Sequence, residues 1–265
     1  MRKTRQSMLL RIIIPPLIVV LLAVLLLGLG QPLSSNVAAF AWMPVDEFGR
    51  NTWGILSLAM LFSLGKGLAI TTVVALLSAI VAYLASRGDW QWTRVGLRAI
   101  CAIVESVPLV LWIVIVVVSV QGPRLWITLI AFGVLVLPTV TQIFLGEFTR
   151  LRTAPFVEAA NLLGLSEGRI FFGYLLPAAL PVLVPVLIQI LGSAIAIDGA
   201  IGVFGLGNRS DIDLGVFLLR GKEQFLTNPS LLFSALLAYG TLYFYLQWLV
   251  RYSNVVAPRV EQVVQ

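Results

Sequence analysis

The sequence contains no histidine, one cysteine and few charged residues, and each shortage excludes a class of function. Without histidine, no Ser–His–Asp or Cys–His catalytic set can be built. The single cysteine, Cys101, forms no internal disulfide, and inert packing is the role we expect for it. The chain also lacks the nitrogen and sulfur ligands that transition-metal sites usually need. We therefore expect no catalytic residue, no metal site and no cofactor bound by this chain.

Charged residues make up only 11% of the 265 residues, whereas soluble domains carry about 25%. Apolar runs of about 18 or more residues recur, and a helix of that length can cross a bilayer. These runs are too long for barrel strands, and backbone polar groups in lipid must be satisfied within the segment. The sequence therefore predicts an all-α integral membrane protein with no separate soluble domain.

The apolar runs predict six transmembrane helices. Residues 1–30 are expected to hold a basic cytoplasmic tail and the first span, which we interpret as a retained anchor because it is long for a signal peptide. A cleavable signal peptide stays open as the alternative. A periplasmic loop (31–55) and a five-helix core (56–265) are expected to follow. The predicted spans are about 12–30, 56–85, 99–120, 125–145, 177–199 and 231–250.

The distribution of Lys and Arg favours both termini in the cytoplasm. With the N-terminus inside, twelve of the eighteen Lys and Arg fall on the cytoplasmic side, as the positive-inside rule predicts. They are Arg2, Lys3, Arg5, Arg11, Arg87, Arg94, Arg98, Arg150, Arg152, Arg169, Arg251 and Arg259. This bias accounts for the net charge of +6 without a nucleic-acid partner. It also places residues 146–176, between the fourth and fifth spans, in the cytoplasm.

Residues 146–176 have the pattern of a short helix, a glycine turn and a second short helix. Apolar residues spaced by three and four predict an amphipathic helix over 156–164. Gly164 can take the left-handed conformation that ends a helix, and Ser166 can cap the next one. The small residues Ala159 and Ala160 let a partner surface come close. An ordinary interfacial hairpin explains these residues equally well.

The pattern E-A-A, three residues, G, then L-P twelve residues further on resembles the EAA loop of binding-protein-dependent ABC permeases. In that family the loop forms a coupling helix, which sits in a cleft of the cytoplasmic ATPase subunit. The resemblance implies a type I ABC importer permease fold and an ATPase-coupling role for this loop. The matching positions are Glu158, Ala159, Ala160, Gly164, Leu165, Ser166 and Pro177.

Two further segments resemble the C-type second permease subunit of dipeptide, oligopeptide and nickel importers. Residues 46–51, D-E-F-G-R-N, are similar to a signature before the second span. They give Asp46, Glu47, Gly49 and Arg50 as periplasmic signature positions. Residues 198–207 are similar to that family's E-A-x-L-S-F-L-G-L-G segment.

The chain also departs from that pattern. Asn51 replaces the usual Asp, Gly202 stands where Ser is common, and Leu214 stands where Trp is common. The loop after the first span is short. The substrate therefore need not be a peptide.

Two carboxylates are candidates for the substrate path. Glu105 falls in the third predicted span, and Asp198 falls at the outer end of the fifth. Ionisable groups at membrane depth are costly and usually face a cavity or a partner. For Glu105 the alternatives are a structural hydrogen bond or a place nearer the interface. For Asp198 the alternative is a cap on the glycine-rich turn that follows it.

The resemblance implies a permease subunit in the bacterial cytoplasmic (inner) membrane. Its expected partners are a second permease subunit, identical or different, two ATPase subunits that hold ATP and Mg, membrane lipid, and a periplasmic or lipid-anchored solute-binding protein. The expected substrate is a peptide, then nickel or a metal chelate, then another small solute. A stand-alone secondary transporter or a membrane scaffold are the alternatives. A secondary transporter predicts charges clustered at mid-membrane or an internal repeat, and the sequence shows neither.

Overall fold

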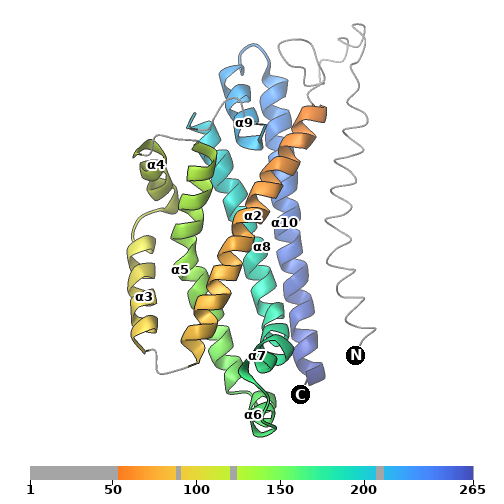
Figure 1. Ribbon diagram of the computed structural model, residues 1–265. Coiled ribbons are helices and arrows are strands. Elements are labelled where there is room, and N and C mark those ends of the chain that lie inside the picture. Colours follow the sequence, from red (N-terminus) through yellow and green to blue (C-terminus); the bar gives the residue numbers. More distant parts are fainter. Residues whose placement is uncertain (1–52, 88–90, 120–123, 207–211, 265) are drawn as a thin grey trace. The chain divides into compact units, whose positions relative to one another are not determined.

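The computed structural model describes residues 53–87, 91–119, 124–206 and 212–264, and every regular element within these ranges is a helix (Figure 1). The predicted first span and nearly all of the predicted periplasmic loop lie outside the described residues. The helices are α2 (Trp53–Ser86), α3 (Gln91–Glu105), α4 (Leu109–Ser119), α5 (Arg124–Arg152), α6 (Pro155–Leu162), α7 (Glu167–Ile170), the π-helical turn η1 (Phe171–Leu175), α8 (Leu176–Val203), α9 (Leu214–Glu223) and α10 (Pro229–Val264).

Four helical segments of the described chain are long and apolar enough to cross a membrane. They are Gly54–Ser86, Ile127–Arg152, Glu167–Val203 and Pro229–Ser253. These segments confirm the second, fourth, fifth and sixth predicted spans. The helix of the fifth span runs on to Val203, so the glycine-rich turn predicted to begin at Gly199 begins only after that residue.

The third predicted span is not one continuous helix. Helix α3 ends at Glu105, α4 begins at Leu109, and the two helices are bent by 82°. The cause is Pro108, which has no amide hydrogen and disfavours the helical conformation of the residue before it. The indole Nε1 of Trp112 donates to the carbonyl of Val104 across the break, at 3.2 Å. By contrast, Pro138 lies inside α5, which continues as one helix.

The chain divides into two compact units, and residues 1–65 and 198–242 form the first. The first six residues of helix α9 are buried in this unit, whereas the charged residues near its end are exposed. The Asp213 carboxylate caps the helix by accepting a hydrogen bond from the Val216 amide at 2.8 Å. The Ser63 hydroxyl accepts one from the Leu214 amide at 3.1 Å. These bonds satisfy amide groups at the buried start of α9, which would otherwise lack partners.

Close backbone packing in the first unit explains one departure from the family pattern. A Cβ atom on Gly202 would lie 2.4 Å from the Cα of Gly215. Real Cβ atoms essentially never show contacts this short. The serine common at position 202 would force α8 and α9 apart here. Glycine at this position therefore permits the close contact between the two helices.

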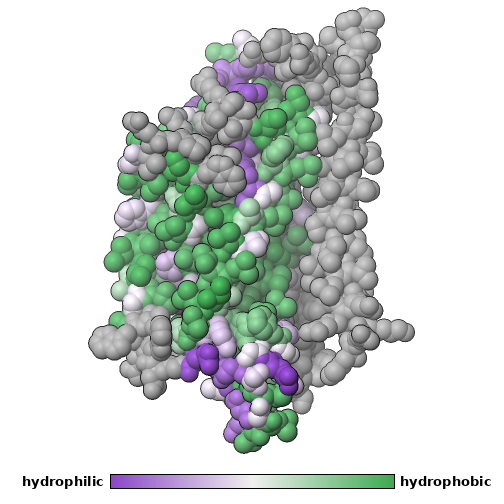
Figure 2. All heavy atoms as spheres, viewed as in Figure 1, coloured by the Kyte–Doolittle hydropathy of each residue, from purple (hydrophilic) through white to green (hydrophobic). Residues whose placement is uncertain are grey.

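Residues 66–197 and 243–265 form the second unit, which contains the helices around the EAA-like loop. Phe132, Phe148 and Leu183 are among its most deeply buried side chains. A buried hydrogen bond of 3.1 Å, from the Thr141 hydroxyl to the Ser78 hydroxyl, joins α5 to α2. Figure 2 shows hydrophobic residues over the long helices and hydrophilic residues gathered where α6 and α7 lie in Figure 1.

Candidate functional site

The segment between α5 and α8 folds as the sequence predicts, with two short helices joined by a glycine turn. Gly164 has a φ of 70°, in the left-handed region. Its amide donates to the Asn161 carbonyl at 3.0 Å, and the Leu165 amide donates to the Ala160 carbonyl at 3.2 Å. These two bonds form a Schellman motif, which ends α6 and turns the chain toward α7. The predicted conformation of Gly164 is therefore confirmed.

The cap predicted at Ser166 is only half correct. Ser166 occupies the N-cap position of α7 and has an extended backbone, but its side chain makes no capping hydrogen bond. Helix α6 begins without a side-chain cap, at Ala154, and Pro155 occupies its first turn. Proline there fixes a helical φ and removes an amide that would have no helical partner. Pro177 likewise lies in the first turn of α8.

The predicted coupling residues lie on two faces of α6. Val157 and Ala160 are buried and hold the helix against its own chain, whereas Glu158 and Ala159 are exposed. Ala160 therefore cannot offer a small contact surface to a partner, as the sequence suggested for the alanine pair. The next residues, Leu162 and Leu163, are 84% and 79% exposed. The tip of the loop is thus apolar and uncovered, which the amphipathic pattern alone did not reveal.

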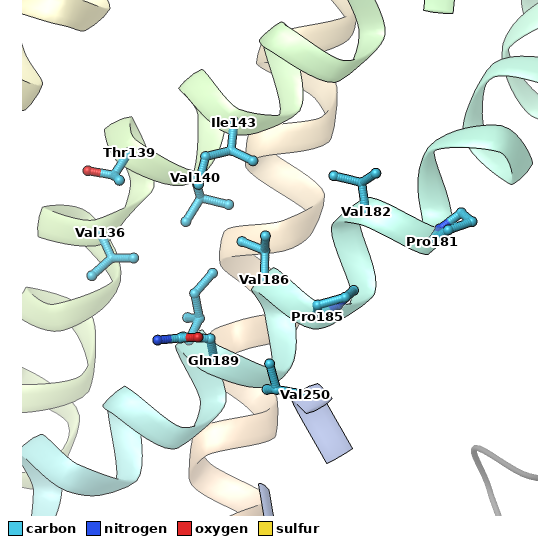
Figure 3. A pocket seen from close by; sticks show the side chains of 11 residues that line it. Val136, Thr139, Val140, Ile143, Pro181, Val182, Pro185, Val186, Gln189 and Val250 are labelled. Atoms are coloured by element: carbon cyan, nitrogen blue, oxygen red, sulfur yellow. The ribbon is translucent and has the colours of Figure 1, made fainter. Parts of the chain in front are cut away.

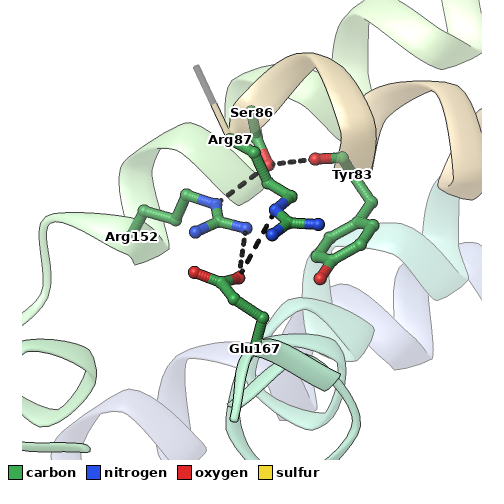
Figure 4. Close-up of polar contacts among 5 residues, drawn as sticks. All are labelled: Tyr83, Ser86, Arg87, Arg152 and Glu167. Atoms are coloured by element: carbon green, nitrogen blue, oxygen red, sulfur yellow. Dashed lines mark hydrogen bonds and ion pairs between the residues drawn. The ribbon is translucent and has the colours of Figure 1, made fainter. Parts of the chain in front are cut away.

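A cluster of polar residues anchors the base of this loop (Figure 4). We call Tyr83, Ser86, Arg87, Arg152 and Glu167 the arginine clamp. The Arg152 guanidinium donates to the Ser86 hydroxyl at 3.0 Å and to the Glu167 carboxylate at 3.3 Å. Arg87 lies 3.8 Å from the same carboxylate oxygen. Both guanidinium carbons lie 5.6 Å from the centre of the Tyr83 ring, within range of a cation–π interaction.

The clamp joins three elements that are distant in sequence: the end of α2, the end of α5 and the start of α7. The Arg152 side chain is only 19% exposed, so its bonds are less screened by water than those of a surface pair. Next to the clamp, Phe171 of η1 packs against Tyr83 and Phe148, with ring centroids 4.3 and 5.5 Å apart. The loop is thereby tied to both long helices by polar and by aromatic contacts.

The other predicted site residues do not gather with the loop. Glu105 is exposed and is the last residue of α3, next to the break before α4. Asp198 is partly buried within α8, in the first unit. Their roles in a substrate path stay predictions. The periplasmic signature positions Asp46, Glu47, Gly49 and Arg50 lie outside the described residues.

A cavity of about 560 Å³ lies between α5 and α8 in the second unit (Figure 3). It is lined by Val136, Thr139, Val140, Ile143, Pro181, Val182, Pro185, Val186, Gln189, Ile190 and Val250. Thr139 and Gln189 carry the only polar side chains among these residues. We call this cavity the α5–α8 groove.

Several bacterial permeases are similar to this chain. The dipeptide transport system permease protein DppC of Alkalihalophilus pseudofirmus is 26% identical over 185 residues, which are 70% of this chain and 60% of the relative. The glutathione transport system permease protein GsiD of Pectobacterium atrosepticum is 21% identical over 198 residues, 74% of this chain and 65% of the relative. The chain thus spans less than two thirds of the length of these relatives.

Solved structures and the family profile agree with this similarity. An inward-facing structure of the MetNI methionine ABC transporter matches with a TM-score of 0.51 and 19% identity, over 78% of this chain and 97% of that one. At this identity the match shows a shared helical fold. The profile described as "Binding-protein-dependent transport system inner membrane component" matches residues 75–260. The resemblance to peptide-type ABC importer permeases is therefore confirmed, and the chain is a multi-pass membrane protein that belongs to the family of binding-protein-dependent transport system inner membrane components.

Proposed function

We propose that this chain is the transmembrane permease subunit of an ATP-driven ABC importer in the bacterial cytoplasmic (inner) membrane. The observation that carries the proposal is the loop between α5 and α8, whose base is fixed by the arginine clamp and whose tip is apolar and exposed. In this proposal the chain forms the path and is not itself an enzyme. ATP and Mg are held by separate ATPase subunits, which perform the hydrolysis.

The tip of α6 suits contact with an ATPase. Burying an exposed leucine stabilises a complex by roughly 1.5–3 kcal/mol, and Leu162 and Leu163 are adjacent. Leu162 and Leu163 lie between the apolar segments Ile127–Arg152 and Glu167–Val203 and belong to neither, so a protein partner is the cover we propose for them. The exposed residues Glu158 and Ala159 on the same short helix would border this contact.

The base of the loop suits transmission of movement. The clamp ties α7 to the ends of α2 and α5, so a displacement of α6 is passed to long helices and is not absorbed within the loop. When ATP closes the ATPase pair, the attached helices would tilt and favour the outward-open arrangement. This is a two-state shift driven by differential affinity for the two arrangements.

The assembly that we propose contains a second permease subunit, as a homodimer or a heterodimer, and two ATPase subunits. A periplasmic or lipid-anchored binding protein would deliver the solute. The names of the two relatives support a peptide as the substrate, because they refer to dipeptide and glutathione transport. Nickel in chelated form, or another small solute, is the second candidate, because the chain has no histidine to bind a bare metal ion.

The proposal is tested by purifying the chain from its native membrane in gentle detergent and identifying the proteins that accompany it. We expect an ATPase subunit and a second permease subunit with the wild type. The double variant Leu162→Glu/Leu163→Glu should insert normally but lose the ATPase. Leu226→Glu is the matched control, because Leu226 is 96% exposed and lies outside the loop.

Three results would distinguish the alternatives. A wild-type chain that is stable and accompanied by no other subunit would refute the importer and favour a secondary transporter or a scaffold. A double variant that retains the ATPase would refute the role of the α6 tip. Loss of the ATPase in Leu226→Glu as well would show a general effect of added charge.

A further inference from the structure

A regular row of prolines that ends in a glutamine runs along α8 beside the α5–α8 groove, and the coupling loop does not require it. Pro177, Pro181 and Pro185 follow one another on α8 at intervals of four residues, and Gln189 occupies the next position. Residues spaced by four form one ridge along a helix. Pro181, Pro185 and Gln189 of this ridge line the groove (Figure 3).

Prolines at this spacing remove hydrogen-bond donors from the same side of the helix. Pro181 and Pro185 have no amide hydrogen, so the carbonyl groups of Pro177 and Pro181 lack their usual donor four residues ahead. Helix α8 nevertheless continues from Leu176 to Val203. In a hydrocarbon environment such carbonyl groups are costly, and they are tolerated where they face protein or a water-filled cavity.

Gln189 adds an exposed carboxamide to the same ridge, within the apolar segment Glu167–Val203. Its amide group has two donors and one acceptor, and contact with lipid tails would leave them unpaired. Thr139 on α5 also lines the groove, but its hydroxyl donates to the Cys101 sulfur at 3.9 Å. No charged side chain is among the described residues that line this groove. The groove therefore offers the Gln189 carboxamide and the carbonyl group of Pro181 on an otherwise apolar wall.

We propose that the α5–α8 groove is a wet wall of the solute path and that it binds the amide groups of an uncharged section of the solute. Carbonyl oxygens and a carboxamide complement peptide N–H groups, and lipid tails offer no donors to them. The volume of about 560 Å³ is that of a small-molecule site. This proposal rests on the proposed transport function and adds Gln189 to Glu105 and Asp198 as a candidate polar residue of the path.

Cysteine labelling tests whether the groove is wet. Cys101 is the only cysteine, so Cys101→Ala provides a cysteine-free background. Gln189→Cys is then compared with Ile188→Cys, which lies at the same depth but does not line the groove. The probe is a cationic, membrane-impermeant methanethiosulfonate, applied to the assembled complex in membrane vesicles. Because thiols in apolar surroundings stay protonated and inert, we expect Gln189→Cys to react about tenfold faster. Equal, slow labelling of both variants would overturn the proposal.

Protection by a peptide tests the occupant. Ala-Ala added together with the binding protein should slow the labelling of Gln189→Cys, and labelling that no peptide slows would overturn the assignment of an amide solute. Copurification of the ATPase is measured on the same membranes. Labelling without an ATPase would refute the importer and leave the wet groove standing. If the ATPase copurifies but Gln189→Cys is not labelled, the importer stands and only the proposal for the groove is refuted.

Discussion

Replacing Glu167 by glutamine tests whether the arginine clamp holds the loop. The substitution keeps the size of the side chain and removes the charge that faces Arg152 at 3.3 Å and Arg87 at 3.8 Å. Exposed ion pairs contribute about 0.2–1 kcal/mol, and hydrogen bonds to charged groups about 1.5–3 kcal/mol. Glu167 is 42% exposed and Arg152 only 19%, so the middle of the combined range applies. We expect a loss of about 1–2 kcal/mol in the free energy of unfolding.

A double-mutant cycle with Arg152→Gln separates the contact from other effects of the substitutions. The free energy of unfolding is measured by titrating the purified complex from mild detergent into a denaturing one. We expect a coupling energy of about 1 kcal/mol, because Arg87 still faces Glu167 when Arg152 is changed. Glu158→Gln, measured on the permease subunit without its ATPase, is the control, because it removes the same charge from an exposed site in the first turn of α6 and should change stability by less than about 1 kcal/mol.

The same variant has a functional consequence if the clamp transmits movement. Loosening the base of the loop should let α6 follow the ATPase without tilting α2 and α5, so Glu167→Gln should hydrolyse ATP but import less solute per ATP. The ratio of uptake to hydrolysis in proteoliposomes measures this. A coupling energy near zero would refute the clamp as a contact. A measured coupling energy with an unchanged ratio would refute its role in transmission.

Two glycine positions give further predictions. Gly202→Ala should destabilise the first unit by about 1–3 kcal/mol, because its Cβ would lie 2.4 Å from the Gly215 backbone. Gly146→Ala is the control and should be tolerated, because no atom lies within 4 Å of its Cβ. Thermal unfolding compares the stability of the two variants. Gly164→Ala should cost about 1–2 kcal/mol through the left-handed φ alone. Gly164→Pro should abolish ATP-coupled uptake without blocking membrane insertion, and normal uptake by this variant would contradict the coupling role of the turn.

Hydropathy was enough to predict the long helices because each contains one long run of mostly apolar residues. It predicted α2, α5, α8 and α10, whose ends lie beyond the predicted spans. At the third span it predicted the apolar run, which α3 and α4 share, but not the break within it, because composition does not show whether a proline bends a helix or breaks it. Pro138 lies within an unbroken α5, whereas Pro108 lies at a bend of 82°.

The site was predictable only where the signal is local. A glycine after an amphipathic stretch indicates a left-handed turn, and Gly164 forms one. The arginine clamp has no such signal, since Arg87, Arg152 and Glu167 come from three elements. In the sequence the two arginines counted only as cytoplasmic charges, and a charge count does not show which carboxylate they contact.

The exposed tip and the clamped base of the loop belong to one mechanical arrangement. An apolar tip on a flexible tether would bind a partner, but it could move without displacing the helices behind it. Here α6 is seated by the buried side chains of Val157 and Ala160, and α7 is fixed by the Glu167 carboxylate. Phe171 packs on Tyr83 directly after α7. A partner that moves Leu162 and Leu163 therefore has to move the ends of α2 and α5 as well, or break contacts worth about 1–2 kcal/mol at the clamp.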